Sequence, residues 1–456
     1  MTGEGRGPWR WLALLLFGYV LARPVSNNHV LVPVLGVIGL LAAGTVLVTR
    51  RRLDAAFVPA LLITFLFALV GLASGPTNPG FTGAVLVFIA APLLWWTCAV
   101  AVDERTMRGL FTTAAVVTVF VGGTIALYVA QNTGALPALL PGWLLEQYGA
   151  GYGELSGSQL GGADYTEVRF YALSTLVATG PMWIGSLFVT RDRLLPPWWL
   201  RALAAAAATA GALSGGRRAI ALVMVLAPVL LWALRWAVAR AGAPTTPGRG
   251  GPLLLVGGLA GLLALVFDPG LLGRGVVGAA LNSLSSFVTG RTFVGASAGE
   301  DQIRVHESEV LLRAWSEAPL FGHGLGATIS GYWRDPVEPW RWELQYHGLL
   351  LQTGVVGVLL VLLGAAATAA AVLRAVRARP DLTPSLLVAC TGAAGMLIGN
   401  ASNPYLQAPG HVWAIFLPVA VANLMLRSAQ RPPGADRDLH PTPVGAGVQH
   451  REGSAP

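Results

Sequence analysis

Long runs of apolar residues recur along almost the whole chain, and they constrain its fold more than any other feature. A helix that crosses the hydrocarbon core of a bilayer needs about 20 apolar residues. Stretches close to this length follow one another from residue 9 to residue 427. Only 11% of the 456 residues are charged, whereas about 25% are charged in soluble domains. The sequence therefore predicts an all-α, polytopic bundle of transmembrane helices.

We expect about twelve spans within a single membrane domain, residues 1–430. The expected spans are 9–23, 29–49, 55–74, 81–102, 109–130, 168–190, 196–213, 217–239, 252–268, 345–373, 384–402 and 410–427. A cleaved signal peptide is the alternative for the first, short span. The sequence "YVLARP" is a poor cleavage site and favours an uncleaved helix. The Pro-rich, polar segment 431–456 is predicted to be a disordered cytoplasmic tail.

The arginines predict how the chain is oriented. All basic residues are Arg, and many gather in the short connections 49–54, 103–108, 190–193, 235–242 and 374–380. With twelve spans these connections share one side, which the positive-inside rule makes cytoplasmic together with both termini. We interpret the net charge of +8 as this bias, so no nucleic-acid partner is expected. The long segment 269–344 then becomes a large extracytoplasmic loop, expected to contain short amphipathic helices.

The stretch "LSGGRRAIAL", residues 213–222, breaks the positive-inside pattern. It puts Arg217 and Arg218 at the start of the eighth span, on the outer side. Guanidinium groups at a helix N-terminus form a strong anion site, because the helix dipole already presents positive charge there. The structural alternative is that both side chains extend to lipid headgroups.

Residues 299–327 predict an amphipathic helix that ends before Pro319 and is followed by a Gly-rich turn. One face carries Arg304, Glu307 and Ser308. The opposite, apolar stripe has helical spacing and consists of Ile303, Val310, Leu311, Ala314, Trp315 and Ala318. The structural alternative is a helix that simply lies on the membrane surface.

Glu343 and His347 lie where the large outer loop re-enters the membrane. They are four residues apart and are expected to share a helix face. A carboxylate or a neutral imidazole could act there as a general base, although both could also be structural residues of the interface. No metal site or other cofactor is expected, because His306, Glu307 and Glu309 lack a recognised ligand spacing.

In this order, the three stretches resemble the O-antigen ligase and O-antigen polymerase family of glycosyltransferases. "LSGGRRAIAL" is similar to a Ser-Gly-Ser-Arg-Gly-Ala motif, with Arg217 as its arginine. "IRVHESEVLLRAWSEAPLFGHGLGA" resembles the segment from an arginine, here Arg304, to a Pro-Leu-x-Gly-x-Gly-x-Gly turn. "ELQYHGLLLQTGVVG" is similar to a His-Asn-x-Tyr-Leu segment, which puts Tyr346 on the tyrosine and Glu343 on the histidine. "EVRFYALSTLVATGPMW" more faintly resembles an Arg-bearing helix start and suggests Arg169.

The resemblance implies a C-type glycosyltransferase of the bacterial plasma membrane that needs no metal. Its donor would be a polyprenyl-diphosphate-linked glycan on the outer leaflet, and its acceptor a hydroxyl of a glycan or lipid. It implies catalytic roles for Arg217, Arg304 and Glu343. Substrate-binding roles would fall to Arg218, Arg169, Tyr346 and His347. Since the family histidine falls on Glu343, the choice of base between Glu343 and His347 stays open, as does ligase against polymerase.

Two other functions fit the same composition. A transporter or flippase for an anionic lipid or solute would also use arginines at one mouth of a bundle. Such proteins typically show internal repeats, broken helices and polar residues near the midplane, and the sequence shows no repeat. A non-catalytic scaffold for envelope assembly is the third possibility. A scaffold gives no reason for Arg217, Arg304 and Glu343 to converge.

Overall fold

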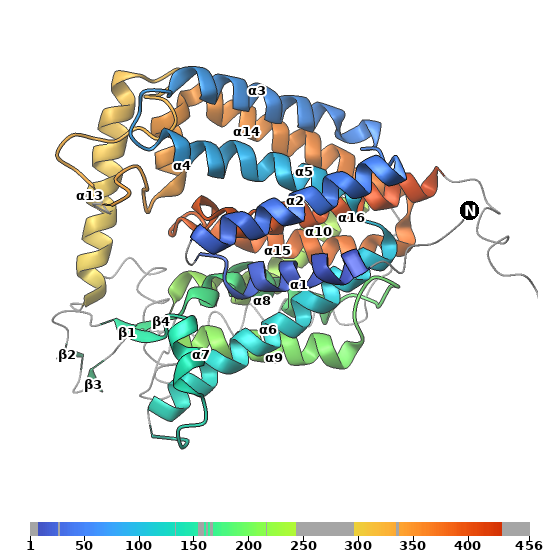
Figure 1. Cartoon of the computed structure of the whole chain (residues 1–456), viewed down its shortest axis with the longest axis horizontal. Helices are drawn as coiled ribbons and strands as arrows, with labels where there is room; N and C mark the ends of the chain where they lie inside the picture. Colours follow the sequence, from blue (N-terminus) through green and yellow to red (C-terminus); the bar gives the residue numbers. More distant parts are fainter. Residues whose placement is uncertain are drawn as a thin grey trace, which may run out of the picture.

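A computed structural model of the chain describes residues 8–25, 28–132, 134–153, 159–160, 163–164, 167–215, 217–242, 296–333 and 337–430. Helices make up most of this part, and their axes run in roughly the same direction through one bundle (Figure 1). The α-helices are α1 Pro8–Ala22, α2 Asn28–Thr49, α3 Val58–Ser74, α4 Phe81–Val85, α5 Ala91–Ala101, α6 Glu104–Asn132, α7 Gly142–Gln147, α8 Leu176–Ser186, α9 Trp198–Gly215, α10 Arg218–Arg240, α13 Ala296–Glu317, α14 Gln345–Ala378, α15 Thr383–Gly399 and α16 Trp413–Ala429. A π-helical turn, η2 Leu86–Ala90, joins α4 to α5. Short 3₁₀ turns are η1 Ala55–Phe57, η3 Tyr171–Thr175, η5 Pro380–Leu382, η6 Tyr405–Gln407 and η7 Pro409–His411.

Eight helical segments of the described part are long and apolar enough to cross a membrane. They are His29–Thr49, Ala55–Ser74, Phe81–Ala101, Glu104–Asn132, Ala219–Arg240, Gln345–Ala378, Pro380–Gly399 and Pro409–Ala429, and Trp9–Ala22 is a shorter apolar helix. The predicted helical membrane bundle is therefore present. The expected span 252–268 lies outside the described residues, so the number twelve stays a prediction.

The expected span 168–190 is not among these candidates, and two short pairs of strands accompany the helices. Residues 167–169 form strand β4 Glu167–Arg169, which pairs antiparallel with β1 Gly151–Gly153. A second small pair consists of β2 Gln159–Leu160 and β3 Ala163–Asp164. The turn η3 and then α8 follow β4, and α8 alone has 11 residues, or about 17 Å, against the roughly 30 Å of a hydrocarbon core. Ten of these residues are buried, so the run is apolar because protein surrounds it.

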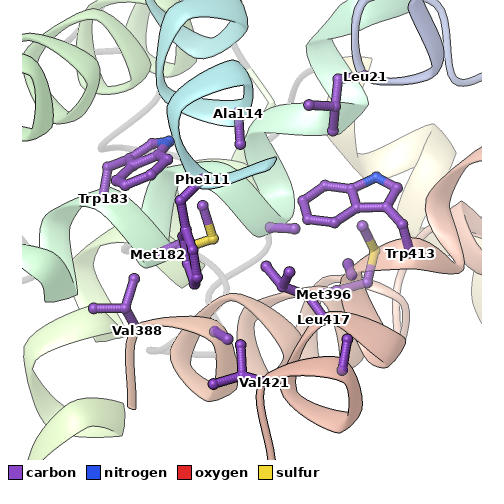
Figure 2. Close-up of a cluster of buried hydrophobic side chains, with 14 of the residues drawn as sticks. Leu21, Phe111, Ala114, Met182, Trp183, Val388, Met396, Trp413, Leu417 and Val421 are labelled. Carbon is purple, nitrogen blue, oxygen red and sulfur yellow. The ribbon is translucent and has the colours of Figure 1, made fainter. Parts of the chain in front are cut away.

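The core lies around α8, between α1, α6, α15 and α16 (Figure 2). Trp183 of α8 is fully buried and donates its indole N–H to Thr118 Oγ1 of α6, at 3.0 Å. One turn further along α6, Gly122 packs directly on Gly211 of α9, where a methyl group on either residue would collide with backbone. Such close crossings of small residues are how helices associate without a hydrophobic driving force between them.

Charged residues gather at one end of the bundle, which we call the arginine-rich end. It comprises the connections 50–57, 102–108, 190–197, 241–242, 379–382 and 427–430. Ion pairs tie them together, including Arg51–Asp103 at 2.9 Å and Arg193–Glu104 at 3.0 Å. Burial alone would raise the pKa of Asp103, but hydrogen bonds from Thr106 and Arg51 more than offset it and lower that pKa. The predicted gathering of these connections at one end is thus seen in the structure.

The other end of the bundle, here called the site end, comprises the connections 75–80, 318–333, 337–344 and 400–412. They contact one another through side-chain amides: Asn78 donates to the carbonyls of His323 and Leu325, both at 3.0 Å, and Gln407 donates to that of Trp342 at 2.9 Å. Helix α13 lies across this end, almost perpendicular to the bundle (Figure 1). It has 22 residues and ends at Glu317, two residues before Pro319, as expected. The part of the expected loop from 269 to 295 lies outside the described residues.

Helix α14 consists of two parts joined at a break. Gly354 has φ 61° and ψ −168°, a conformation that interrupts the helical ladder. The N–H groups of Val355 and Val356 therefore lose their normal partners, the carbonyls of Leu351 and Gln352. All 34 residues in one line would measure about 50 Å, well over the roughly 30 Å of a hydrocarbon core. The part after the break is long enough to cross the core by itself, and Gln345–Thr353 lies at the site end.

The Gly-rich turn 319–326 replaces the bonds that the break removes. Val355 N donates to Pro319 O at 2.9 Å and Val356 N to Leu320 O at 3.0 Å, while Leu351 O accepts from His323 N at 2.8 Å and Gln352 O from Gly324 N at 3.0 Å. Buried backbone groups are costly without partners, so the turn and the break stabilise each other.

Replacing Gly354 with Ala should therefore destabilise the protein. The new methyl group would collide with the carbonyl of Leu320, and alanine disfavours the left-handed conformation. We expect a loss of about 1–3 kcal/mol, measured as thermal unfolding of the purified protein in detergent. Gly364→Ala in the same helix meets only Ile63 at 3.5 Å and should be neutral or slightly stabilising. Equal melting temperatures for the two variants would contradict the role of the break.

Candidate functional site

Two parallel side-chain contacts join α13 to the start of α14. Arg304 Nη2 lies 2.8 Å from Glu343 Oε1, and Ser308 Oγ lies 3.3 Å from His347 Nε2. Arg304 and Ser308 are one helical turn apart on α13, and their partners are four residues apart in sequence. The site therefore presents a guanidinium, a carboxylate, an imidazole and a hydroxyl along one seam. We call these four residues the seam cluster.

The seam cluster corrects one detail of the sequence interpretation. Leu344 is the N-cap of α14, so Glu343 lies in the bend before the helix and does not share a helix face with His347. The two side chains are brought to the same seam by α13. The helix begins at Gln345, where the expected span begins, so what differs is the face that Glu343 and His347 were expected to share.

Helix α13 packs on protein and is no isolated surface helix. Leu311 is fully buried against Trp342 and Leu351. Glu307 is also fully buried, and its Oε1 accepts a hydrogen bond from Leu344 N at 3.1 Å. In the predicted apolar stripe, Ile303 is exposed, whereas Ala314 and Trp315 pack beside this small core. The carboxylate of Glu307 thus binds the N–H of the N-cap residue of α14 and holds the start of this helix against α13.

A second set of polar residues lies in the connection between α15 and α16, and the sequence interpretation missed it. Gln407 is 4% exposed and holds the carbonyl of Trp342, the residue before Glu343. His411 is buried, with its ring nitrogens 2.8 Å from Tyr405 O and 2.9 Å from Ser174 Oγ. The only signal in the sequence was the polar stretch 400–411 between two spans, which resembled an ordinary connection.

The Gly-rich turn has further partners that the sequence did not reveal. Asn78 holds two of its carbonyls, and the side chain of Gln352, 1% exposed, accepts from Gly326 N at 3.0 Å. Gly324 and Gly326 have positive φ and lie against the backbone of 74–81, where a Cβ would collide. These contacts place the C-terminal end of α13, and hence the seam cluster.

The other predicted site residues lie in different places. Tyr346 turns toward α15, where its hydroxyl donates to Leu397 O at 2.6 Å, a terminal helix carbonyl. Arg217 is the N-cap of α10, at the site end of the bundle. Arg218 is the first residue of α10, and Arg169 ends strand β4, where a helix start was expected. The side chains of Arg218 and Arg169 lie outside what the structure describes.

The electrostatics of the seam cluster suit an anionic ligand. The side chains of Arg304 and Glu343 are 23% and 13% exposed, so they interact in a medium less polar than water. A guanidinium bound to a carboxylate can exchange that partner for a phosphate, which it can bind in a bidentate geometry. Within the described ranges, no three His, Cys, Asp or Glu side chains converge in a way that could hold a metal ion.

Comparison with known proteins adds no further support. No protein-family model matches the sequence, and no curated protein is significantly similar to it. The resemblance to polytopic glycosyltransferases therefore depends on the motif residues and their order.

A double-mutant cycle should detect the Arg304–Glu343 pair without any assay of function. Arg304→Met and Glu343→Gln should each destabilise the protein, because each leaves a partly buried charge without its partner. The double variant should be more stable than the sum predicts, with a coupling of about 1 kcal/mol for a pair this exposed. Unfolding in detergent measures it. Arg313→Met, on the exposed face of α13, should be additive with Glu343→Gln; additivity of the Arg304 pair as well would contradict the contact.

Proposed function

We propose that the chain is a metal-independent glycosyltransferase that moves a polyprenyl-diphosphate-linked glycan onto an acceptor hydroxyl outside the membrane. The observation that supports this most is the Arg304–Glu343 pair, with His347 and Ser308 beside it, at the end of the bundle opposite the arginine-rich connections. The product would be a cell-envelope polysaccharide, as in O-antigen ligases or polymerases.

The chemistry explains why the site would use arginine. The acceptor oxygen attacks the anomeric carbon, the bond from that carbon to the phosphate oxygen breaks, and polyprenyl diphosphate leaves with the electron pair. Negative charge therefore grows on the diphosphate in the transition state. Fixed guanidinium donors stabilise such charge by several kcal/mol in a site that excludes water. Arg304 would supply this stabilisation, and Arg217 at the N-terminus of α10 would add to it.

The pairing of Arg304 with Glu343 suggests how donor binding would prepare the base. A diphosphate carries more charge than a carboxylate and would compete with it for Arg304. Glu343, released from the guanidinium, would become more basic and could accept the proton of the acceptor hydroxyl. His347 and Ser308 would orient the acceptor, with Tyr346, Arg218 and Arg169 in supporting roles. If Glu343 instead stays bound to Arg304, His347 is the base.

A transporter is the second candidate, because α14 is broken at Gly354 and transporters use broken helices. Transporter sites lie near the bilayer midplane. The break in α14 comes nine residues after its first residue, Gln345, and is filled by a turn from the site end. This position favours the transferase.

The site end should face the outside of the cell. The positive-inside rule puts the arginine-rich end in the cytoplasm, and the site end opposes it. With Cys98 and Cys390 replaced, a cysteine at exposed Ser330 should react with an impermeant maleimide in intact cells. A cysteine at exposed Arg52 should react only after permeabilisation, as the matched control. The reverse pattern would overturn the orientation and the proposed donor.

Arg304→Ala should reduce glycan transfer at least 100-fold, measured with purified protein and lipid-linked donor. Arg304→Lys should be almost as damaging, since an ammonium cannot form the bidentate contact. Arg313→Lys, on the exposed face of the same helix, should leave the rate unchanged. Glu343→Gln should bind donor and lose turnover. Wild-type transfer by Arg304→Ala would remove the seam cluster from the mechanism.

A further inference from the structure

A basic hollow opens at the arginine-rich end, far from the seam cluster. Its volume is about 420 Å³. It is lined by Arg108, Thr112, Arg191, Asp192, Arg193, Leu195, Pro196 and Pro197, which come from the first turns of α6 and the connection that leads to α9. Nothing in the proposed transfer reaction uses it.

The three arginines of the hollow differ in their partners. Arg193 pairs with Glu104 at 3.0 Å and lies 4.0 Å from Asp381. Arg108 donates its Nε to the carbonyl of Arg193 at 2.7 Å, which leaves its two terminal nitrogens for a ligand. In the described part of the chain, no carboxylate lies within ion-pair distance of Arg108 or Arg191. These two guanidinium groups give the hollow its positive charge.

The one acidic residue that lines the hollow is committed to the protein. Asp192 Oδ1 accepts from Leu194 N at 2.8 Å and Leu195 N at 3.1 Å, and Oδ2 accepts from Ser385 N at 2.8 Å. The Ser385 hydroxyl donates to the same carboxylate. Asp192 thus joins the connection 190–197 to α15. Pro196 and Pro197 restrict the backbone just before α9. The hollow is preformed, and its carboxylate does not compete for the arginines.

The surroundings of the hollow match the boundary between lipid and water. Trp198 and Trp199, directly after the prolines, are 61% and 63% exposed. Exposed tryptophans in this position are typical of the headgroup region of a membrane protein. Helices α6 and α9 both begin at the hollow, so their dipoles add partial positive charge. Basic pockets between helices on the cytoplasmic side bind anionic headgroups.

We infer that this hollow binds the phosphate group of an anionic phospholipid of the adjoining leaflet. Arg108 and Arg191 would hold the phosphate, and the half-buried Pro197 would contact the glycerol. A soluble phosphate has the same charge chemistry, but it gives no reason for the exposed tryptophans beside the hollow. The inference is independent of glycan transfer.

Native mass spectrometry of the full-length protein in detergent tests it. Dioleoyl-phosphatidylglycerol, dioleoyl-phosphatidylcholine and inorganic phosphate serve as separate probes. The parent protein should bind phosphatidylglycerol at least 10-fold more tightly than phosphatidylcholine. The double variant Arg108→Gln/Arg191→Gln should bind phosphatidylglycerol roughly 10- to 30-fold more weakly. Arg52→Gln, an exposed arginine at the same end but outside the hollow, should bind like the parent.

The outcomes separate the explanations. Unchanged melting temperatures without lipid show that the variants fold, because neither arginine holds an ion pair in the described structure. Equal phosphatidylglycerol binding by parent and double variant would overturn the site. Equal binding of both lipids by the parent would do the same. Inorganic phosphate that binds as tightly as phosphatidylglycerol, and is lost in the double variant, would overturn the lipid and assign a soluble anion.

Discussion

Backbone groups in apolar surroundings must find hydrogen-bond partners, and the junction of the 319–326 turn with α14 meets this need in both directions. The break at Gly354 releases two N–H groups and two carbonyls, and the turn accepts from the former and donates to the latter. These backbone hydrogen bonds fix the position of Gln345–Thr353, and hence that of His347. They also determine where the chain turns after Glu317, and hence the position of α13 and Arg304. The positions of the site residues therefore depend on the hydrogen bonds between the 319–326 turn and the break at Gly354.

The sequence predicted the periodic part of this structure well. The expected spans 29–49 and 55–74 agree with helices His29–Thr49 and Ala55–Ser74, because long apolar runs that face lipid have little other choice. The gathering of arginines at one end was also expected. Of Arg217, Arg304 and Glu343, whose convergence would argue against a scaffold, the structure shows a contact between Arg304 and Glu343.

Other features depend on tertiary contacts that no local pattern records. Apolarity does not distinguish α8, which protein surrounds, from a helix that lipid surrounds. The pairing of β1 with β4 joins residues that a span was expected to contain. Tyr346 turned out to cap α15, and Gln407 to hold Trp342, because partners distant in sequence were available there. Single amides in connecting loops give almost no signal until the fold brings them together.

The described arginines have the same guanidinium group but differ in the partners that it binds. At the arginine-rich end several are neutralised by nearby carboxylates or bound to backbone carbonyls, as Arg427 is to Val100 and Val102. In the seam cluster a guanidinium meets a carboxylate in partial burial. In the basic hollow, two lack a carboxylate partner among the described residues. A guanidinium stays charged at any physiological pH, so these differences come from geometry alone.

The arrangement along α13 has a kinetic consequence. Three contacts connect this helix to the segment around the start of α14: Arg304 with Glu343, Glu307 with Leu344 N, and Ser308 with His347. All three lie within five residues of one helix, which is a rigid body on this length scale. A tilt or rotation of α13 large enough to break one would break the others at nearly the same moment. Opening of this seam is therefore an all-or-none event with one shared barrier, and any ligand that separates Arg304 from Glu343 by moving the helix exposes the buried carboxylate of Glu307 in the same step.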